Sequence, residues 1–104
     1  MKFGYIYICR FPYTSGDLSK PRPALVLFDL GPDVVICRIT SVQHTGDLDI
    51  SVGEWAVAGL AKPSVIRLNR LVTAEKTLLG TRLGELSAGD QQAVRMAWNA
   101  NMML

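Results

Sequence analysis

The sequence predicts a mainly β protein with one helix: a small, mostly antiparallel barrel that a C-terminal helix closes. Short runs of β-branched and aromatic residues alternate with turn-forming residues, and a helical pattern occurs only at the end of the chain. The 104 residues suffice for a single domain spanning 1–104. They are too few for a two-lobed enzyme or for a doubly wound nucleotide-binding fold.

Several segments carry the strand pattern, because they are rich in aromatic and β-branched residues bounded by turn formers. These segments are residues 3–9, 24–28, 34–40 and 64–73. Residues 47–50 alternate in polarity and are expected to form a short exposed strand. Leu78, Leu79 and Leu83 bracket another short strand or a turn.

The C-terminal segment predicts a helix that begins after Ser87. Ser87 and Asp90 have the spacing of a capping box, in which a hydroxyl and an acid satisfy the first backbone amides reciprocally. Apolar residues then recur on one side of the helix: Val94, Ala97, Trp98 and Met102. We expect this stripe to pack on the domain or on a second subunit.

Composition limits the classes of protein to consider. Hydrophobic residues make up 49% and charged residues 19%, which excludes a disordered chain. So small and apolar a domain favours a homodimer, since small domains bury a modest fraction of their surface. The net charge of +2 is weak evidence about partners by itself. Neither a membrane-spanning stretch nor a signal-peptide pattern occurs, so we expect a cytoplasmic protein.

The two cysteines and the single histidine form no metal-binding motif. Cys9 and Cys37 lie inside apolar runs and are expected to be buried, reduced thiols, with a disulfide as the alternative. We therefore expect neither a metal nor another cofactor.

A predicted hairpin around Gly31 places two polar residues together. A turn centred there puts Arg22 directly opposite Thr40, with both side chains on one face. Prolines on both sides of Arg22 stiffen its backbone. A guanidinium beside a hydroxyl can bind a phosphate, but the spacing alone favours the alternative, a solvated arginine at the start of a strand.

The chain resembles the MazF/PemK toxin family through a series of motifs in the same order. Residues 11–14 and 20–27 resemble the family's opening, a Phe-Pro segment followed by a basic residue and Arg-Pro. Residues 39–41, Ile-Thr-Ser, resemble its strand end. Residues 63–73 resemble a later strand, and residues 83–87 the lead into the last helix. The resemblance extends over nearly the whole chain.

The resemblance implies an SH3-like β-barrel of the CcdB/MazF/PemK type with a C-terminal helix, usually as a homodimer. It implies the toxin of a type II toxin-antitoxin system, a metal-independent endoribonuclease that cleaves single-stranded RNA and inhibits growth. The ribose 2′-hydroxyl would attack, leaving a 2′,3′-cyclic phosphate and a 5′-hydroxyl. A cognate antitoxin would block the toxin, and DNA would be reached only through their complex.

The same resemblance assigns the site residues. The family's catalytic arginine and threonine fall on Arg22 and Thr40, and fixed cationic and hydroxyl donors suit the charge that develops on a phosphate under attack. RNA contacts are expected from Lys20, Arg38, Ser41, His44, Arg67 and Asn69. Arg38 shares the strand face of Thr40, whereas solvated surface roles are the alternative for Lys20 and His44.

One position departs from the family pattern. Some members have an acid two residues after the later arginine, where this chain has Asn69 after Arg67. Asparagine cannot act as a carboxylate base, but it can hydrogen-bond a base edge or a 2′-hydroxyl. We expect a role in recognition or a weakened activity.

Other functional roles remain alternatives. The loop at 12–20 is expected to cover the RNA site, with a disordered surface loop as the alternative. Trp55 is expected to be half-buried packing rather than a base-stacking or partner-binding residue. A non-catalytic toxin or regulator on the same barrel, acting by binding protein as related gyrase poisons do, is the rival function. In a generic SH3-like interaction domain, the pairing of Arg22 with Thr40 would be accidental.

Overall fold

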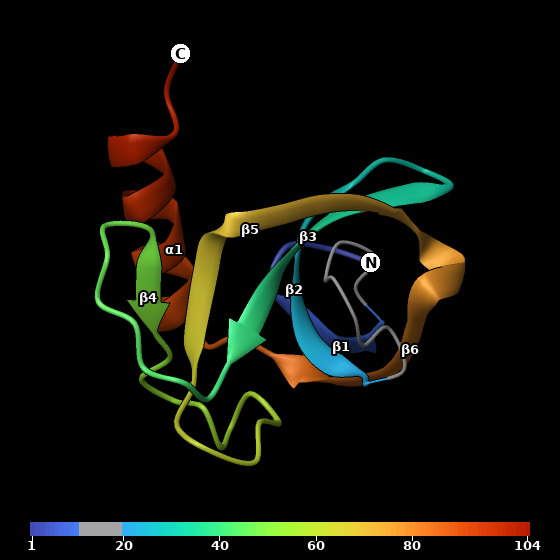
Figure 1. Cartoon of the computed structure of the whole chain (residues 1–104), viewed down its shortest axis with the longest axis horizontal. Coiled ribbons are helices and arrows are strands. Elements are labelled where there is room, and N and C mark those ends of the chain that lie inside the picture. Colours follow the sequence, from blue (N-terminus) through green and yellow to red (C-terminus); the bar gives the residue numbers. More distant parts are fainter. Residues whose placement is uncertain (11–19) are drawn as a thin grey trace.

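A computed structural model describes residues 1–10 and 20–104 of the chain. Within these residues, six antiparallel strands form one sheet in the order β4-β5-β3-β2-β1-β6, and a helix follows (Figure 1). The elements are β1 Tyr5–Cys9, β2 Arg22–Asp29, β3 Asp33–Thr40, β4 Asp49–Ser51, β5 Val65–Glu75, η1 Lys76–Leu78, β6 Leu79–Glu85 and α1 Ala88–Asn101. In this part of the chain no helix has the length and apolar character needed to cross a membrane.

The sheet curls into a barrel-like shape without closing. The long strand β5 bends along its length, and η1 then turns the chain back so that β6 pairs with β1 (Figure 1). The edges of the sheet, β4 and β6, do not pair with each other. The predicted fold class is confirmed. The segment expected to be a short strand or a turn after Leu78 is a full edge strand.

The predicted hairpin register is confirmed from Ala24 to Val26 and wrong near the turn. Ala24 faces Arg38, as a turn centred on Gly31 requires. The register then shifts between Val26 and Phe28, so that Phe28 faces Val35 instead of the predicted Val34. A bulge of this kind adds one residue to one strand and increases its twist, which helps the sheet to curl.

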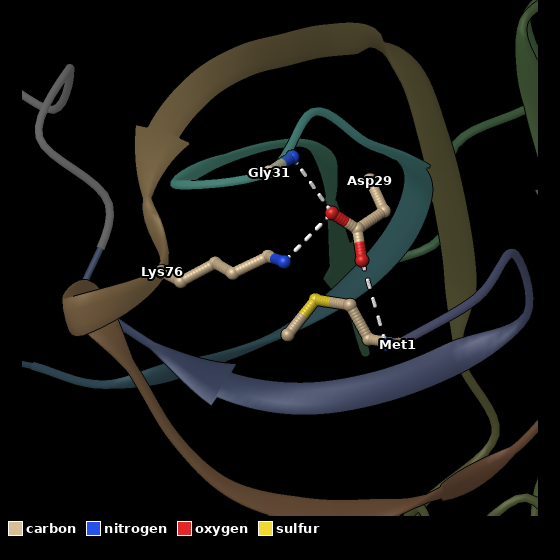
Figure 2. Close-up of polar contacts among 4 residues, drawn as sticks. All are labelled: Met1, Asp29, Gly31 and Lys76. Carbon is tan, nitrogen blue, oxygen red and sulfur yellow. Dashed lines mark hydrogen bonds and ion pairs between the residues drawn. The ribbon is translucent and has the colours of Figure 1, made fainter.

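Asp29 connects three parts of the chain at the turn end of the hairpin. Its carboxylate accepts hydrogen bonds from Lys76 Nζ at 2.7 Å, from the Gly31 amide at 2.9 Å and from the Met1 amino group at 3.5 Å (Figure 2). The hydrogen bond from Lys76 is the main reason that the pKa of Asp29 falls from 3.8 to about 2. The contact fastens η1 to the β2–β3 turn.

The sheet has a hydrophobic cluster on each face. The inner cluster, enclosed by the curl, is formed by Cys9, Ala24, Val26, Val34, Ile36 and Ala74. The outer cluster packs against α1 and includes Leu25, Cys37, Ile39, Ile66, Leu68 and Val94. The two cysteines are buried and free, one in each cluster, as predicted.

The start of α1 only partly matches the predicted capping box. The Ser87 hydroxyl accepts a hydrogen bond from the Asp90 amide at 3.2 Å, as expected. The Asp90 carboxylate, however, accepts hydrogen bonds from the amides of Gly53 at 2.9 Å and Glu54 at 3.0 Å. The predicted return bond from Asp90 to the start of the helix is therefore wrong, because the carboxylate instead fastens the loop after β4 to the helix.

The two tryptophans pack on the outer cluster. Trp55 and Trp98 are both half-buried against it. The ring of Trp98 also meets Phe28 edge to face, with the centroids 5.6 Å apart. The predicted packing roles of both tryptophans are confirmed.

Candidate functional site

Polar and cationic residues gather on the inner face of the sheet, where β2 begins and β3 ends. Strands β2 and β3 are paired as far as Ala24 opposite Arg38. The same register, continued for two residues, brings Arg22 opposite Thr40. Alternate residues of a strand share a face, so Arg22, Arg38 and Thr40 lie on the side of the inner cluster. Together they line one end of the curl, past the apolar residues of the inner cluster.

The strand β5 adds Arg67 to this end. Arg67 lies directly opposite Arg38, and Val65 opposite Thr40. Directly paired residues share a face, so the two arginines are neighbours there. Asp49 of β4 pairs with Arg67 on the other side. The three strands therefore present a row of Arg38, Arg67 and Asp49.

The hydroxyl of Thr40 is held in place by the chain just after β3. Thr40 is only 7% exposed, and its Oγ1 accepts a hydrogen bond from the Val42 amide at 3.1 Å. A hydroxyl has two lone pairs and one proton. The accepted bond occupies one lone pair, and the hydroxyl keeps its proton as a donor.

The Asp49 carboxylate is the acidic group of this site. Its Oδ1 accepts from Arg67 Nε at 2.9 Å, and its Oδ2 accepts from the Gly46 amide at 2.8 Å. Burial acts to raise the pKa of Asp49, but these hydrogen bonds and the charges of Arg67 and His44 outweigh it and lower the pKa. Asp49 is therefore ionised at neutral pH.

The other predicted RNA contacts lie around this end of the sheet. Lys20 is exposed just before β2, and Ser41 is exposed just after β3. His44 is half-buried, close enough for its charge to act on Asp49. The predicted loop at 12–20, with its Thr14, Ser15, Asp17 and Ser19, lies outside the described residues except for Lys20.

Asn69 lies in an irregular part of β5. Arg67 pairs with Arg38 and Leu71 pairs with the next residue of β3, Cys37, so residues 68–70 have no partner on β3. Leu68 and Leu71 both pack on the outer cluster although they are three residues apart. Residues 68–70 thus form a bulge in β5, and Asn69 is exposed within it. The strand register therefore does not bring Asn69 into the row of Arg38, Arg67 and Asp49.

A groove of about 430 Å³ adjoins Arg22. Cys9, which pairs with Arg22 across β1 and β2, lines this groove together with Pro21 and residues 77–81. Burial raises the pKa of the Cys9 thiol to about 11, so the thiol is protonated at neutral pH and is not a nucleophile. Over residues 1–10 and 20–104, no group of three or more His, Cys, Asp or Glu side chains is placed to hold a metal ion.

A second groove lies on the outer face, between β2 and α1. It has a volume of about 420 Å³ and is mainly apolar. Its lining includes Phe3, Leu27, Phe28, Val94 and Trp98. Leu27 and Val94 belong to the outer cluster, so this groove and the arginine row lie on opposite faces of the sheet.

The chain is thus a small protein in which a curled antiparallel sheet carries arginines and a threonine at one end and a helix on its outer face. Residues 2–101 match the model of a family described as PemK-like, MazF-like toxin of type II toxin-antitoxin system. The chain belongs to this family.

Solved structures of MazF-type proteins have the same fold. Mycobacterium tuberculosis toxin MazF-mt6 is similar with a TM-score of 0.78 and 26% identity, over 96% of this chain and 98% of that one. An endoribonuclease in complex with its cognate antitoxin, from a mycobacterial species, has a TM-score of 0.80 and 20% identity, over 98% and 94%. MazF from Deinococcus radiodurans has a TM-score of 0.75 and 18% identity, over 98% and 96%. No curated protein sequence matches significantly.

Proposed function

We propose that the 104-residue chain is a single toxin domain that acts as a metal-independent endoribonuclease on single-stranded RNA. The observation that carries this proposal is the placement of Arg22 and Thr40 on one face at the open end of the curl. Arg38 and Arg67 extend the same face. Membership of the toxin family and the endoribonuclease among the structural neighbours support the reaction class.

The reaction we propose is an internal transesterification. The ribose 2′-oxygen attacks the adjacent phosphorus, the bond from phosphorus to the 5′-oxygen breaks, and the 2′-hydroxyl proton passes to water. The departing 5′-oxygen takes a proton from water, so the products are a 2′,3′-cyclic phosphate and a 5′-hydroxyl. Negative charge grows on the non-bridging oxygens, where preorganised donors stabilise it better than water does.

Arg22 and Thr40 would supply these donors. A guanidinium offers parallel N–H groups to two phosphate oxygens, and the Thr40 proton is free to serve a third because the Val42 amide already fixes the hydroxyl. The permanent charge of Arg22 makes it a poor general acid. We therefore assign both residues to charge stabilisation.

RNA would bind along this end of the sheet. Arg38 and Arg67 are placed to contact neighbouring phosphates. Lys20, Ser41 and His44 flank them, and the groove beside Arg22 has room for part of a nucleotide. Asn69, exposed in its bulge, would contact a base edge or a 2′-hydroxyl.

We also propose a cognate antitoxin and a second copy of the chain as partners. One structural neighbour was solved with its antitoxin. The apolar groove between β2 and α1 provides a surface for protein contacts, with Phe28 47% exposed beside it. The toxin would act on cytoplasmic mRNA and inhibit growth, and it would reach DNA only as part of an antitoxin complex.

Purified protein incubated with single-stranded RNAs of varied sequence in excess EDTA tests the proposal. We expect cleavage in EDTA and growth arrest when the protein is expressed without an antitoxin. Growth arrest without cleavage of any RNA would contradict the proposal. That result would indicate the rival function, a non-catalytic toxin that acts by binding another protein.

A further inference from the structure

We propose that Asp49 is a positioning residue of the RNA site, which holds Arg67 so that its guanidinium binds a substrate phosphate next to the one held by Arg22. The acid would thus come from the edge strand β4, and not from position 69 of β5. This inference rests on the proposed function and deepens it. It stands on the pairing of β4 with β5 and on the 2.9 Å contact between Arg67 Nε and Asp49 Oδ1.

The charges of the row explain why an acid is needed there. Arg38 and Arg67 are directly opposite each other, and like charges in that position repel. Asp49 lies on the far side of Arg67 and compensates one of the two positive charges. The formal charge of these three side chains is then +1.

Burial makes the contact between Asp49 and Arg67 specific. The side chain of Arg67 is 18% exposed and that of Asp49 6% exposed. A pair so little exposed to water is less screened by salt than a surface pair, and loss of one partner leaves a poorly solvated charge. Arg67 is therefore confined to one orientation.

The geometry of the guanidinium leaves donors for the substrate. Arginine has five N–H groups in one plane, and the contact with Asp49 uses the group on Nε. This contact leaves the four N–H groups on the two Nη atoms for other partners. A fixed guanidinium with donors to spare is the usual arrangement for binding a phosphate.

The Asp49 carboxylate is itself held by the chain before β4. Its second oxygen accepts from the Gly46 amide at 2.8 Å, and the Asp49 amide donates to the Gly46 carbonyl at 3.1 Å. Each carboxylate oxygen thus accepts a hydrogen bond, one from Arg67 and one from Gly46.

A double-mutant cycle tests this role. Asp49→Asn keeps the shape and removes the charge, whereas Arg67→Ala removes the positioned group. We expect each single variant to weaken RNA binding about tenfold, the size of one charge-assisted hydrogen bond. The double variant should bind no more weakly than Arg67→Ala. Asp47→Asn, an exposed acid two residues earlier, is the matched control and should bind like the original chain.

Binding is measured by fluorescence anisotropy on a labelled single-stranded RNA with 2′-O-methyl riboses, which blocks attack by the 2′-oxygen. Cleavage of the unmodified RNA is measured in parallel. We expect KM to rise in the two single variants and kcat to change little. Losses that multiply in the double variant, or unchanged binding by Asp49→Asn, would overturn the inference.

The two readouts separate this inference from the proposed function. A chain that binds RNA without cleaving it would refute the nuclease, while the binding cycle would still decide the role of Asp49. A chain that does not bind RNA would overturn both. Thermal melting checks that each variant is folded. If Asp49→Asn does not fold, Arg67→Lys tests the inference in its place. Lysine lacks the planar group that contacts Asp49 and a phosphate at the same time, so we expect this variant to bind RNA more weakly. Normal binding by that variant would overturn the inference.

Discussion

Gly59 packs directly against the backbone carbonyl of Leu83, so closely that an added Cβ at Gly59 would overlap it. Gly59 also has a φ of +90°, which favours glycine. A Cβ added at Gly84, next to Leu83, would likewise overlap the carbonyl of Ala58. Backbone thus meets backbone where the loop after β4 covers the end of the edge strand β6. An edge covered in this way is protected from pairing with other chains.

Gly59→Ala should therefore destabilise the protein strongly. The left-handed conformation costs a non-glycine residue about 1–2 kcal/mol, and the overlap with Leu83 adds to this cost. Gly31→Ala is the matched control, since Gly31 also has a φ of +90° but an added Cβ there would meet no other atom within 4 Å. Urea unfolding should show a loss of about 1–2 kcal/mol for Gly31→Ala and a clearly larger loss for Gly59→Ala. Equal losses would contradict the close packing of the loop on β6.

Arg22→Ala should abolish most RNA cleavage and leave the fold intact. Arg22 is only half-buried, at the start of β2. Removal of one donor to the developing charge costs roughly a hundredfold to a thousandfold in kcat. Arg95→Ala is the control, because Arg95 on α1 lies over the ring of Phe3, away from the site. Cleavage rates and melting temperatures of both variants decide the matter, and undiminished cleavage by a folded Arg22→Ala variant would refute the assignment.

Thr40→Val should also reduce cleavage. Valine has nearly the same shape, but it removes both the donor for the phosphate and the acceptor for the Val42 amide. We expect a loss of roughly a hundredfold in kcat, while Thr40→Ser, which keeps the hydroxyl, should retain most of the activity. Single-turnover cleavage separates the two variants. Equal activity of the valine and serine variants would show that the hydroxyl takes no part.

Asp29 should make the stability depend on pH in the acid range. Its pKa is lowered in the folded protein, from 3.8 to about 2, chiefly by the hydrogen bond from Lys76. The stabilisation by Asp29 is therefore complete above about pH 4 and is lost as the pH falls from about 4 to about 2. The melting temperature should fall less steeply across this window in Asp29→Asn than in the original chain.

Asp33→Asn controls for the removal of an acid from the same hairpin. Within the part of the chain that the structure describes, Asp33 makes none of the side-chain contacts that Asp29 makes. Its melting curve should follow the original chain between pH 4 and pH 2. A drop of the same steepness in Asp29→Asn and in the original chain would contradict the role of the contacts in Figure 2.

Much of the fold was predictable because local pattern and tertiary structure agree. The hairpin register near Arg22 followed from Gly31 alone, since side chains alternate along both strands. The N-cap at Ser87 followed from a hydroxyl placed before a helical stripe. That Arg38 and Thr40 share a face of the sheet could be predicted from their spacing of two residues on one strand.

Contacts between distant segments could not be predicted in this way. The pairing of Asp49 with Arg67 depends on which strands become neighbours, and a three-residue strand such as β4 carries no signal for its partner. Asp90 matched a local motif, but its carboxylate bonds to a loop 36 and 37 residues away in sequence. The bulge that displaces Asn69 from the ladder likewise arises from the packing of Leu68 and Leu71 on one cluster.

The central claim is that this chain cleaves RNA by attack of the ribose 2′-oxygen on a phosphate held by Arg22 and Thr40. The most direct test uses one RNA that the protein cuts, synthesised with a single 2′-deoxyribose just before the cut phosphate. We predict that the modified strand binds but is not cut there, and that the unmodified strand yields a 2′,3′-cyclic phosphate and a 5′-hydroxyl. Cleavage of the modified strand at the same phosphate would contradict the claim.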